Sequence, residues 1–198
     1  TTIITCHLGN GCSMAAVKNG KVIDTTMGLT PLEGLMMGTR CGDMDPAAVI
    51  RLAELGLSPK ELDKTLNKKS GLYGIGGINS GDMRDMINAA AEGNAQAELA
   101  LKMFVRRVVK YIGAYYVLLG GAEALVFTGG IGEYSVPIRK RVMEGIAALN
   151  IKIDPAKNDS CFGKKGIIST DDSAWKAIVM PTNEELMIAL STMKVLGK

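Results

Sequence analysis

Short runs with a strand-like pattern open the chain. Residues 2–6, 13–18 and 21–26 are rich in apolar and β-branched side chains, and Asn19-Gly20 separates the last two runs. Asn-Gly between two such runs is a strong signal for a β-hairpin, because both residues tolerate the positive φ angles of its tight turn. The first 26 residues therefore predict an antiparallel meander of three strands.

From residue 45 the apolar side chains recur at helical spacing, and capping residues mark the boundaries. Asp45-Pro46 predicts the start of a helix that ends at Gly56, and Ser58 with Glu61 forms a capping box for a second helix. Further helices are expected over residues 82–91, 94–119 and 137–149 and after a capping box at 182–185.

Short apolar runs between these helices predict further strands, at residues 125–127, 151–153 and 177–180. Three strands followed by alternating helices and strands is the order of an α/β domain with a mixed sheet. No internal repeat or low-complexity linker divides the chain. We therefore expect residues 1–198 to form one domain.

Composition and charge narrow the classes of function. Hydrophobic residues make up 47% of the 198 residues and charged residues 22%, which is typical of a globular protein with a core. The net charge of +3 comes without a basic run, which argues against nucleic acid and weakly favours a phosphate-bearing ligand. No apolar stretch has the length of a membrane span, and no signal peptide opens the chain, so no membrane partner is expected.

The four cysteines and the single histidine argue against a zinc site, since no two cysteines have C-x-x-C spacing. Dispersed cysteines are typical of free thiols in a reducing compartment, so a cytoplasmic location is expected. The chain starts at Thr1, close to an apolar run, which favours a piece of a longer protein.

Glycines gather in four turns, each after a predicted strand or before a predicted helix, where α/β proteins bind ligands. The first turn is His7–Gly11, whose backbone N–H groups can hold an anion, although a plain hairpin connection is the alternative. The second is segment 38–42, around Arg40. Arg40 can clamp a phosphate or carboxylate, or it pairs on the surface with Asp43 or Asp45.

The third turn, residues 81–84, opens a helix, and Asp82 either caps that helix or accepts hydrogen bonds from ribose hydroxyls. The fourth, residues 129–133, has three glycines that leave bare backbone for a flat ring or a diphosphate, with Glu133 near the mouth. A structural turn capped by Ser135 is the alternative. The third segment lacks the Lys-Ser/Thr that follows the glycines of a Walker-type loop, and GIGGIN just before it lacks the spacing of a dinucleotide fingerprint.

Glu184 and Glu185 open the last predicted helix. Glu185 fills the capping-box position, which leaves Glu184 as a solvated acid that favours the helix dipole or as a contact to a water on Mg²⁺. Taken together, four glycine-lined turns at one edge of one sheet favour a cradle for a nucleotide.

Several long blocks of the sequence closely resemble the second half of the acetate/propionate/butyrate kinase family. The resemblance covers essentially the whole chain and is carried by "HLGNGCSMAAVKNGKVIDTTMGLTPLEGLMMGTRCGDMDP", "SGLYGIGG", "GDMRD", "ALVFTGGIGEYS" and "PTNEELMIA". It implies a ribonuclease-H-like fold of the actin, sugar kinase and heat-shock chaperone ATPase type, with ATP between two such domains. It also implies reversible transfer of the γ-phosphoryl group of ATP to acetate.

The resemblance assigns the chain to the C-terminal nucleotide-binding domain, with ATP or ADP as substrate, Mg²⁺ as cofactor and a homodimer as the expected assembly. Carried over by position, Arg40 would be the catalytic arginine and Glu184 the Mg²⁺ ligand. The expected nucleotide contacts are His7, Leu8, Gly9, Asn10 and Gly11 on the phosphate side, Asp82, Met83 and Arg84 beside the adenosine, and Gly130, Ile131, Gly132, Glu133 and Tyr134 beside the adenine.

Two departures from the family pattern matter. The family motif reads G-G-I-G-E-N-S, so Tyr134 replaces an amide with a ring that can stack on the base or cover it. The family's other phosphate loop, substrate arginine, catalytic aspartate, transition-state histidine and acyl pocket belong to its N-terminal half, which this chain lacks. We therefore expect the chain alone to bind ADP or ATP weakly and to catalyse little or nothing.

Two alternatives stay open. A propionate or butyrate kinase would share these residues, because the family selects acyl length outside this half. A non-catalytic ATP-binding module with an actin-like fold is the alternative from another class. Arg40 discriminates between a kinase and a non-catalytic module, since a pure binding module has no need of an arginine directed at the γ-phosphate.

Overall fold

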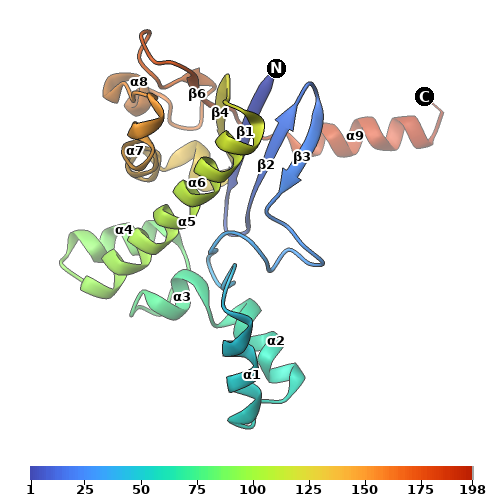
Figure 1. The fold of residues 1–198 in the computed structure, drawn as a ribbon, viewed down its shortest axis with the longest axis vertical. Helices are drawn as coiled ribbons and strands as arrows, with labels where there is room; N and C mark the ends of the chain where they lie inside the picture. The colour runs from blue at the N-terminus through green and yellow to red at the C-terminus, as the bar shows by residue number, and fades with distance from the viewer. Residues whose placement is uncertain (198) are drawn as a thin grey trace.

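The structure, a computed structural model, describes residues 1–197 and is built on a six-stranded mixed sheet (Figure 1). The strand order is β3-β2-β1-β4-β6-β5. The strands are β1 (Thr2–Leu8), β2 (Cys12–Lys18), β3 (Lys21–Thr25), β4 (Ala124–Thr128), β5 (Gly166–Ile167) and β6 (Lys176–Val179). β1, β2 and β3 pair antiparallel, whereas β1, β4 and β6 run parallel. The predicted ribonuclease-H-like α/β architecture is confirmed.

The predicted meander is present, and its hairpin has the expected cause. Asn19 and Gly20 both have positive φ angles, of 51° and 75°, which the tight turn between β2 and β3 requires. Along β1 every second side chain, namely Ile4, Cys6 and Leu8, is fully buried. This alternation gives the sheet a face that needs cover from helices.

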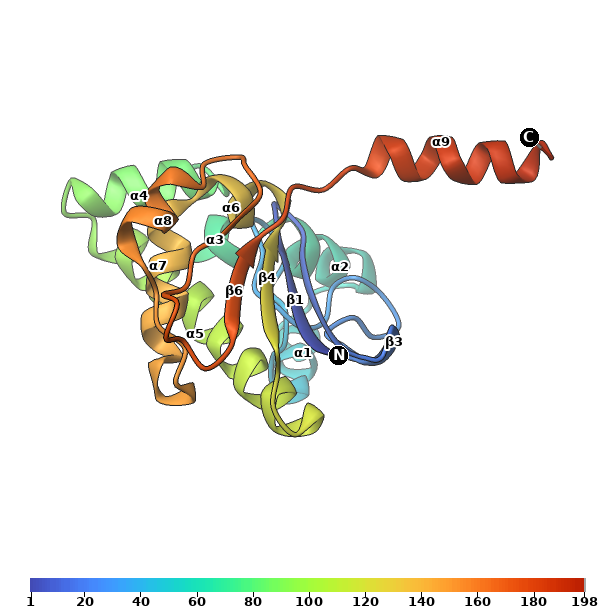
Figure 2. The same ribbon diagram turned by 90° about the horizontal axis from the view of Figure 1, so that it is seen from above.

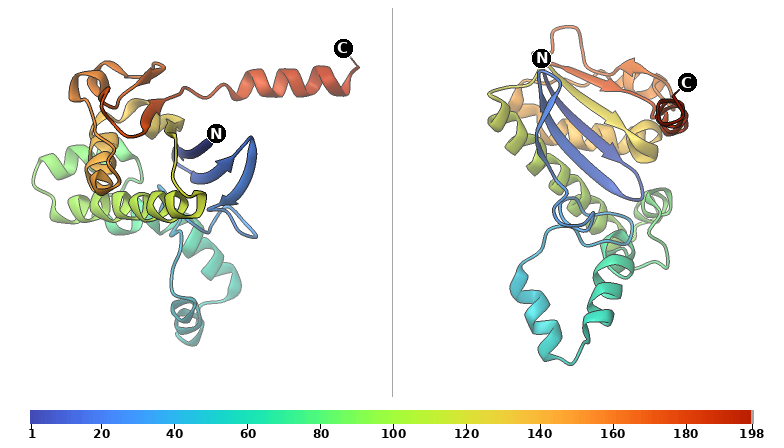
Figure 3. Two further views of the ribbon diagram at one scale, coloured as in Figure 1. Left: turned by 45° about the horizontal axis from the view of Figure 1, so that its top comes forward. Right: turned by 90° about the vertical axis from the view of Figure 1, so that its right-hand side faces the viewer.

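The helices are α1 (Pro46–Glu54), α2 (Pro59–Lys68), α3 (Gly71–Ile75), α4 (Met83–Ala91), α5 (Ala95–Leu119), α6 (Gly129–Tyr134), α7 (Val136–Gly145), η1 (Ala147–Leu149), α8 (Pro155–Ser160) and α9 (Glu184–Val195). The long α5 packs on β1 and β2 and also contacts α3, α4 and α7 (Figure 3). Its buried residues include Leu101, Phe104, Val108 and Ile112, which recur at helical spacing along one face. The core therefore lies between α5 and the sheet.

The helix starts follow their predicted caps. The side chains of Asp45, Ser58, Asp82 and Asn94 each accept a hydrogen bond from a backbone N–H in the first turn of the following helix. At Ser58 the full capping box with Glu61 is formed. These short-range bonds satisfy backbone donors that no intrahelical acceptor can reach.

The edges of two predicted turns differ from expectation. His7 and Leu8 belong to β1, because they continue its pairing with β2 at Ser13 and Cys12. The glycine stretch after β4 forms the short helix α6, not an open loop. Its first residue, Gly129, has a φ of +76°, which redirects the chain from strand to helix.

The last part of the chain was predicted least well. Residues 151–153 contribute a single bridge, between Ile153 and Ser169, instead of a strand. The predicted helix 137–149 is α7 followed by the separate turn η1, and α3, α8 and β5 were not predicted. The capping box at 182–185 is absent, because the side chain of Asn183 caps α9 through the N–H of Leu186.

Two parts of the chain extend away from this body. α1 and α2 form a helical pair at one end, and α9 projects from the other side on a short linker after β6 (Figures 1 and 2). None of these three helices has a buried residue. In the described part of the chain, no helix combines the length and apolar character that crossing a bilayer requires.

Candidate functional site

Three close backbone approaches bring the four glycine-lined turns together beyond the ends of β1 and β4. The N–H of Gly38 donates to the carbonyl oxygen of Asn10 at 3.0 Å, which joins the first turn to the second. A Cβ atom at Gly81 would lie 2.6 Å from the carbonyl oxygen of Gly38. A Cβ atom at Gly129 would lie 2.8 Å from the carbonyl oxygen of Leu8. Glycine is required at these points because the turns touch through bare backbone.

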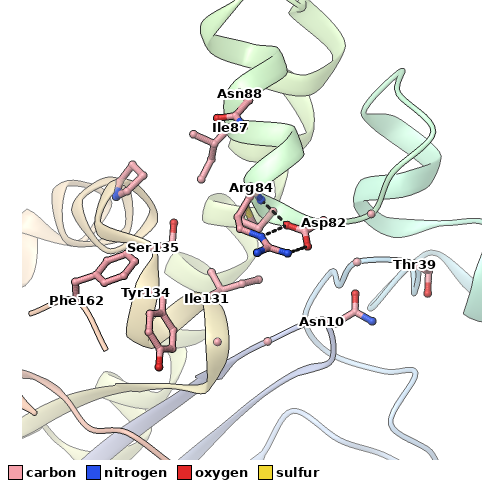
Figure 4. Close-up of a pocket in the computed structure, with 16 residues that line it drawn as sticks. Asn10, Thr39, Asp82, Arg84, Ile87, Asn88, Ile131, Tyr134, Ser135 and Phe162 are labelled. Atoms are coloured by element: carbon pink, nitrogen blue, oxygen red, sulfur yellow. Dashed lines mark hydrogen bonds and ion pairs between the residues drawn. The ribbon is translucent and has the colours of Figure 1, made fainter. Parts of the chain in front are cut away.

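A cavity of about 660 Å³ opens between the turns (Figure 4). Each turn contributes to its lining, which consists of Gly9, Asn10, Gly38, Thr39, Gly81, Asp82, Met83, Arg84, Ile87, Asn88, Gly130, Ile131, Tyr134, Ser135, Pro137 and Phe162. In Figure 4, Asn10 and Thr39 lie on one side and Tyr134 and Phe162 on the other, with Asp82 and Arg84 between them. One end is therefore glycine-lined and polar, and the other is apolar.

The cavity includes many of the residues expected from the sequence, but not all of them. Eight line it, namely Gly9, Asn10, Asp82, Met83, Arg84, Gly130, Ile131 and Tyr134. Seven do not, namely His7, Leu8, Gly11, Arg40, Gly132, Glu133 and Glu184. Leu8 and Gly132 are buried under the turns, where they shape the backbone.

Arg40 lies beside the glycine-lined end. Its Nη1 is 3.5 Å from where a Cβ of Gly11 would stand, and it donates to the carbonyl oxygen of Pro31 at 3.3 Å. The acids that were its alternative partners are engaged elsewhere, since Asp43 pairs with Arg107 at 2.7 Å and Asp45 caps α1. Among residues 1–197 Arg40 forms no ion pair. Its guanidinium therefore remains available to an anion.

Asp82 and Arg84 form a close pair in the middle of the cavity. Asp82 accepts hydrogen bonds from the backbone N–H of Arg84 at 2.8 Å and from its Nε and Nη2 at 3.0 and 2.7 Å. The side-chain bonds from Arg84 are the main reason why the pKa of Asp82 is lowered. The Arg84 side chain is 86% exposed, so it can turn toward a ligand.

Glu133 does not lie at the mouth of the cavity, as the sequence suggested, but inside the protein. It is 6% exposed, and its Oε1 accepts hydrogen bonds from the N–H of Gly129 at 2.9 Å and from the N–H and Oγ1 of Thr182 at 2.9 and 3.0 Å. The carboxylate therefore ties the start of α6 to the linker before α9.

Ser135 begins α7 without capping it through its side chain. A capping hydroxyl normally bonds the N–H of the second or third helical residue, and the second is Pro137, which has none. The buried Oγ of Ser135 has no hydrogen-bond partner among the described residues. The structural alternative for this turn, a helix capped by Ser135, is therefore not what forms.

Tyr134 and Phe162 form an aromatic wall at the apolar end of the cavity. Their ring centroids are 5.2 Å apart and the ring planes meet at 81°, an edge-to-face arrangement. A Cβ at Gly163 would overlap the Tyr134 ring, so the chain passes directly under it. Sequence reasoning missed Phe162, which follows α8 in a segment with no pattern that pointed to the cavity.

The chemistry that these groups can perform is binding and charge stabilisation. Cys12 adjoins the first turn, but burial raises its pKa to about 12, so it supplies no thiolate near neutral pH. Residues 1–197 contain no group of three or more His, Cys, Asp or Glu that could hold a metal ion. α9 projects from the body of the chain (Figure 2), and Glu184 at its start does not line the cavity.

Comparison with known proteins gives consistent matches. The Acetokinase family profile matches residues 1–190. An acetate kinase of Clostridium novyi (strain NT) is 55% identical over 197 residues, which is 99% of this chain and 49% of that protein. A crystal structure of Porphyromonas gingivalis acetate kinase superimposes with a TM-score of 0.94 at 46% identity, over 99% of this chain and 49% of its own.

A propionate kinase from Francisella tularensis subsp. tularensis SCHU S4 superimposes with a TM-score of 0.88, also at 46% identity. That match covers 94% of this chain and 47% of the propionate kinase. The chain therefore spans about half the length of the relatives that it matches.

Proposed function

The chain belongs to the acetokinase family, and on that premise we propose that it is the C-terminal, nucleotide-binding domain of an acetate kinase. The observation that carries the proposal is the convergence of four glycine-lined turns on one cavity. A volume of about 660 Å³ is within the range of small-molecule sites and suits a nucleoside diphosphate.

The two ends of the cavity suit the two ends of a nucleotide. We assign the phosphates to the glycine-lined end, where backbone N–H groups and Asn10 can meet phosphate oxygens. We assign the base to the apolar end, against Ile131 and the aromatic wall of Tyr134 and Phe162. The ribose then lies near Asp82, whose carboxylate can accept hydrogen bonds from its hydroxyls.

In the proposed reaction a carboxylate oxygen of acetate attacks the γ-phosphorus of ATP, and the bond to the β-phosphate oxygen breaks to release ADP. Such transfer needs positioning and positive charge on the equatorial oxygens more than covalent chemistry. The contribution of this chain is to hold the nucleotide and to present Arg40 beside the glycine-lined end. The acetate site would be supplied by the N-terminal half.

Propionate kinase is the second candidate, because a protein of that name shares the fold and 46% of the aligned residues. Within the proposal the acyl pocket lies outside this chain, so both readings use the same cavity. Mg²⁺ would accompany the phosphates, with Glu184 as its candidate ligand in the whole enzyme. A homodimer and a cytoplasmic location complete the proposal.

Two assays test the proposal on the chain itself. Titration with ADP should give saturable, weak binding, and incubation with ATP and acetate should give no acetyl phosphate above background. Absence of nucleotide binding would refute the proposed function. Turnover comparable with that of a complete kinase would refute the role of this chain as one half of the site.

Arg40 separates an enzyme from a binding module. In the full-length kinase, Arg40→Ala should lower kcat by about 10²–10³, the loss typical of removing a donor that stabilises transition-state charge. ADP affinity should stay within about twofold because Arg40 does not line the cavity. Arg51→Ala, at an exposed ion pair on α1, is the matched control and should change neither quantity. If Arg40→Ala changed neither kcat nor ADP affinity, the proposed catalytic role of Arg40 would fail.

A further inference from the structure

Arg139 on α7 is fully buried, yet no carboxylate within residues 1–197 forms an ion pair with it. All its hydrogen bonds go to neutral oxygens. Nε donates to Oδ1 of Asn158 at 2.8 Å. Nη1 donates to the carbonyl oxygens of Gly132 and Glu133 at 3.0 and 2.8 Å, and Nη2 to those of Asn158 and Cys161 at 2.9 and 2.8 Å. A planar fork of five N–H groups is required for this pattern.

The carbonyl groups that Arg139 binds belong to two separate helix ends. Gly132 and Glu133 are near the end of α6, and Asn158 and Cys161 are at the end of α8. The last carbonyl groups of a helix lack the regular intrahelical donor, so other donors satisfy them. The carbonyl oxygen of Asn158 also accepts a hydrogen bond from the N–H of Cys161 at 3.3 Å. A single guanidinium therefore joins the ends of α6 and α8, which are far apart in sequence.

Each joined end leads directly into one ring of the aromatic wall. Tyr134 follows Glu133, and Phe162 follows Cys161. The N–H of Gly163 also donates to the carbonyl oxygen of Glu133 at 3.1 Å, so Arg139 adds to a direct backbone tie, and the edge-to-face contact of the rings depends on the spacing of the two backbones. Arg139 itself does not line the cavity. Any effect of Arg139 on the cavity must therefore be indirect, through Tyr134 and Phe162.

We propose that Arg139 is a positioning residue for the apolar end of the cavity, whose buried fork sets the spacing of the aromatic wall against which a nucleobase rests. That the ligand carries a nucleobase rests on the proposed function. The alternative is that Arg139 only stabilises the fold, in which case its loss weakens every ligand alike.

The test compares ADP with pyrophosphate, which lacks the base, in calorimetric titrations of the 198-residue chain. Arg139→Lys keeps the charge but cannot reach both helix ends, because an ammonium is a compact donor. It should weaken ADP binding about tenfold, the scale of a lost base–aromatic contact, and leave pyrophosphate binding unchanged. The near-ultraviolet circular dichroism of the aromatic residues should change as well.

A matched control separates positioning from general stability. Met14→Ala removes a buried side chain from β2, away from the aromatic wall, and lowers the stability of the chain. It should leave the ratio of the ADP and pyrophosphate dissociation constants at the wild-type value. Equal weakening of both ligands by Arg139→Lys, or no weakening of either, would overturn the proposal.

Asn158→Ala provides a second variant if Arg139→Lys does not fold. It removes the acceptor of the Nε bond, together with the bond from Nδ2 of Asn158 to the carbonyl oxygen of Val136, but keeps Arg139 and its four bonds to carbonyl oxygens. It should show the same selective loss of ADP affinity, at about threefold, and an unchanged ratio would overturn the proposal. If the wild-type chain binds neither ligand, the proposed function fails and the inference fails with it, whereas an unchanged ratio in a chain that binds ADP refutes the inference alone.

Discussion

The cavity region and the projecting helix α9 differ in how closely their residues pack against the rest of the described chain. Around the cavity, backbone meets backbone at van der Waals limits, and buried groups such as Glu133 and Arg139 have their hydrogen bonds made within the described chain. On α9, apolar side chains face solvent on every side, with Ile188 66% and Val195 87% exposed. No residue of α9 is buried.

The cavity region is therefore packed within the described chain, whereas α9 contributes little to the described body. The turns of the cavity are fixed by contacts inside the chain, so their geometry does not depend on α9. Glu133 links the cavity to the linker before α9, because its carboxylate accepts hydrogen bonds from both Gly129 and Thr182. Several large exposed apolar side chains on one helix are typical of a surface that another element covers, and none of the described elements covers α9.

The sharpest test of the packing around the cavity compares two neighbouring glycines. Gly129 has a positive φ and no room for a Cβ, whereas a Cβ at Gly130 would meet nothing within 4 Å. Gly129→Ala should therefore lower the free energy of unfolding by about 2–3 kcal/mol through backbone strain and overlap. Gly130→Ala, the matched control, should change it by less than about 0.5 kcal/mol. Urea unfolding measures both, and equal effects would show that the turns are not in contact as described.

A larger side chain at Gly130 should affect binding without affecting the fold. Gly130 lines the cavity and has open space above it, so the branches of Gly130→Val would occupy ligand volume. We expect ADP affinity to fall at least about tenfold, or about 1.4 kcal/mol, while the unfolding midpoint stays near that of Gly130→Ala. Titration with ADP and urea unfolding measure the two effects. Unchanged ADP binding would place the ligand elsewhere.

Asp82 offers a smaller effect with a defined pH dependence. It caps α4, so Asp82→Ala should cost about 1 kcal/mol of stability at pH 7. The pKa of Asp82 is lowered in the folded protein, mainly by hydrogen bonds from Arg84, so its ionised form stabilises the fold above the ordinary pKa near 4 and this contribution is lost as pH falls. The difference between wild type and Asp82→Ala should shrink between pH 5 and about pH 2 in urea unfolding.

Asp82→Asn is the control, because asparagine caps helices without titrating. Its difference from Asp82→Ala should be the same at both ends of that pH range. If the difference between wild type and Asp82→Ala instead grew as pH fell, the ionised carboxylate would not be the form that stabilises the fold.

Removal of α9 should have the smallest effect. A chain that ends after Asn183 keeps Thr182 and its bonds to Glu133 but loses a helix with no buried residue. Its free energy of unfolding should stay within about 0.5 kcal/mol of the full chain, and its ADP affinity should be unchanged. Thermal unfolding and titration check this. A large loss of either would show that α9 supports the cavity after all.

Local signals explain what the sequence could predict. The hairpin at Asn19-Gly20 and the caps at Asp45, Ser58 and Asn94 depend on residues within a few positions, and all of them formed. Glycine-rich turns after strands pointed to one sheet edge, and the turns do converge there. Their role in binding a nucleotide stays a prediction.

Long-range contacts explain what the sequence could not predict. Glu133 bonds Thr182 across 49 positions, and Arg139 bonds Asn158 and Cys161 across about twenty. Contacts at such sequence separations leave no periodic pattern in the sequence. Glu133 was therefore expected at the mouth of the cavity, and Phe162 was not expected to line it. The short elements α8 and β5 likewise depend on contacts with other elements, namely with α7, with β6 and with each other.

If the four glycine-lined turns form one ligand site, a single ligand must perturb all of them, and amide chemical shifts during an ADP titration would show this. We expect the amides of Gly9, Gly38, Gly81 and Gly130 to shift together, with one dissociation constant. Shifts confined to a single turn would refute a shared site. So would shifts centred on the second cavity, of about 570 Å³, between α5 and α7 around Met103 and Arg141.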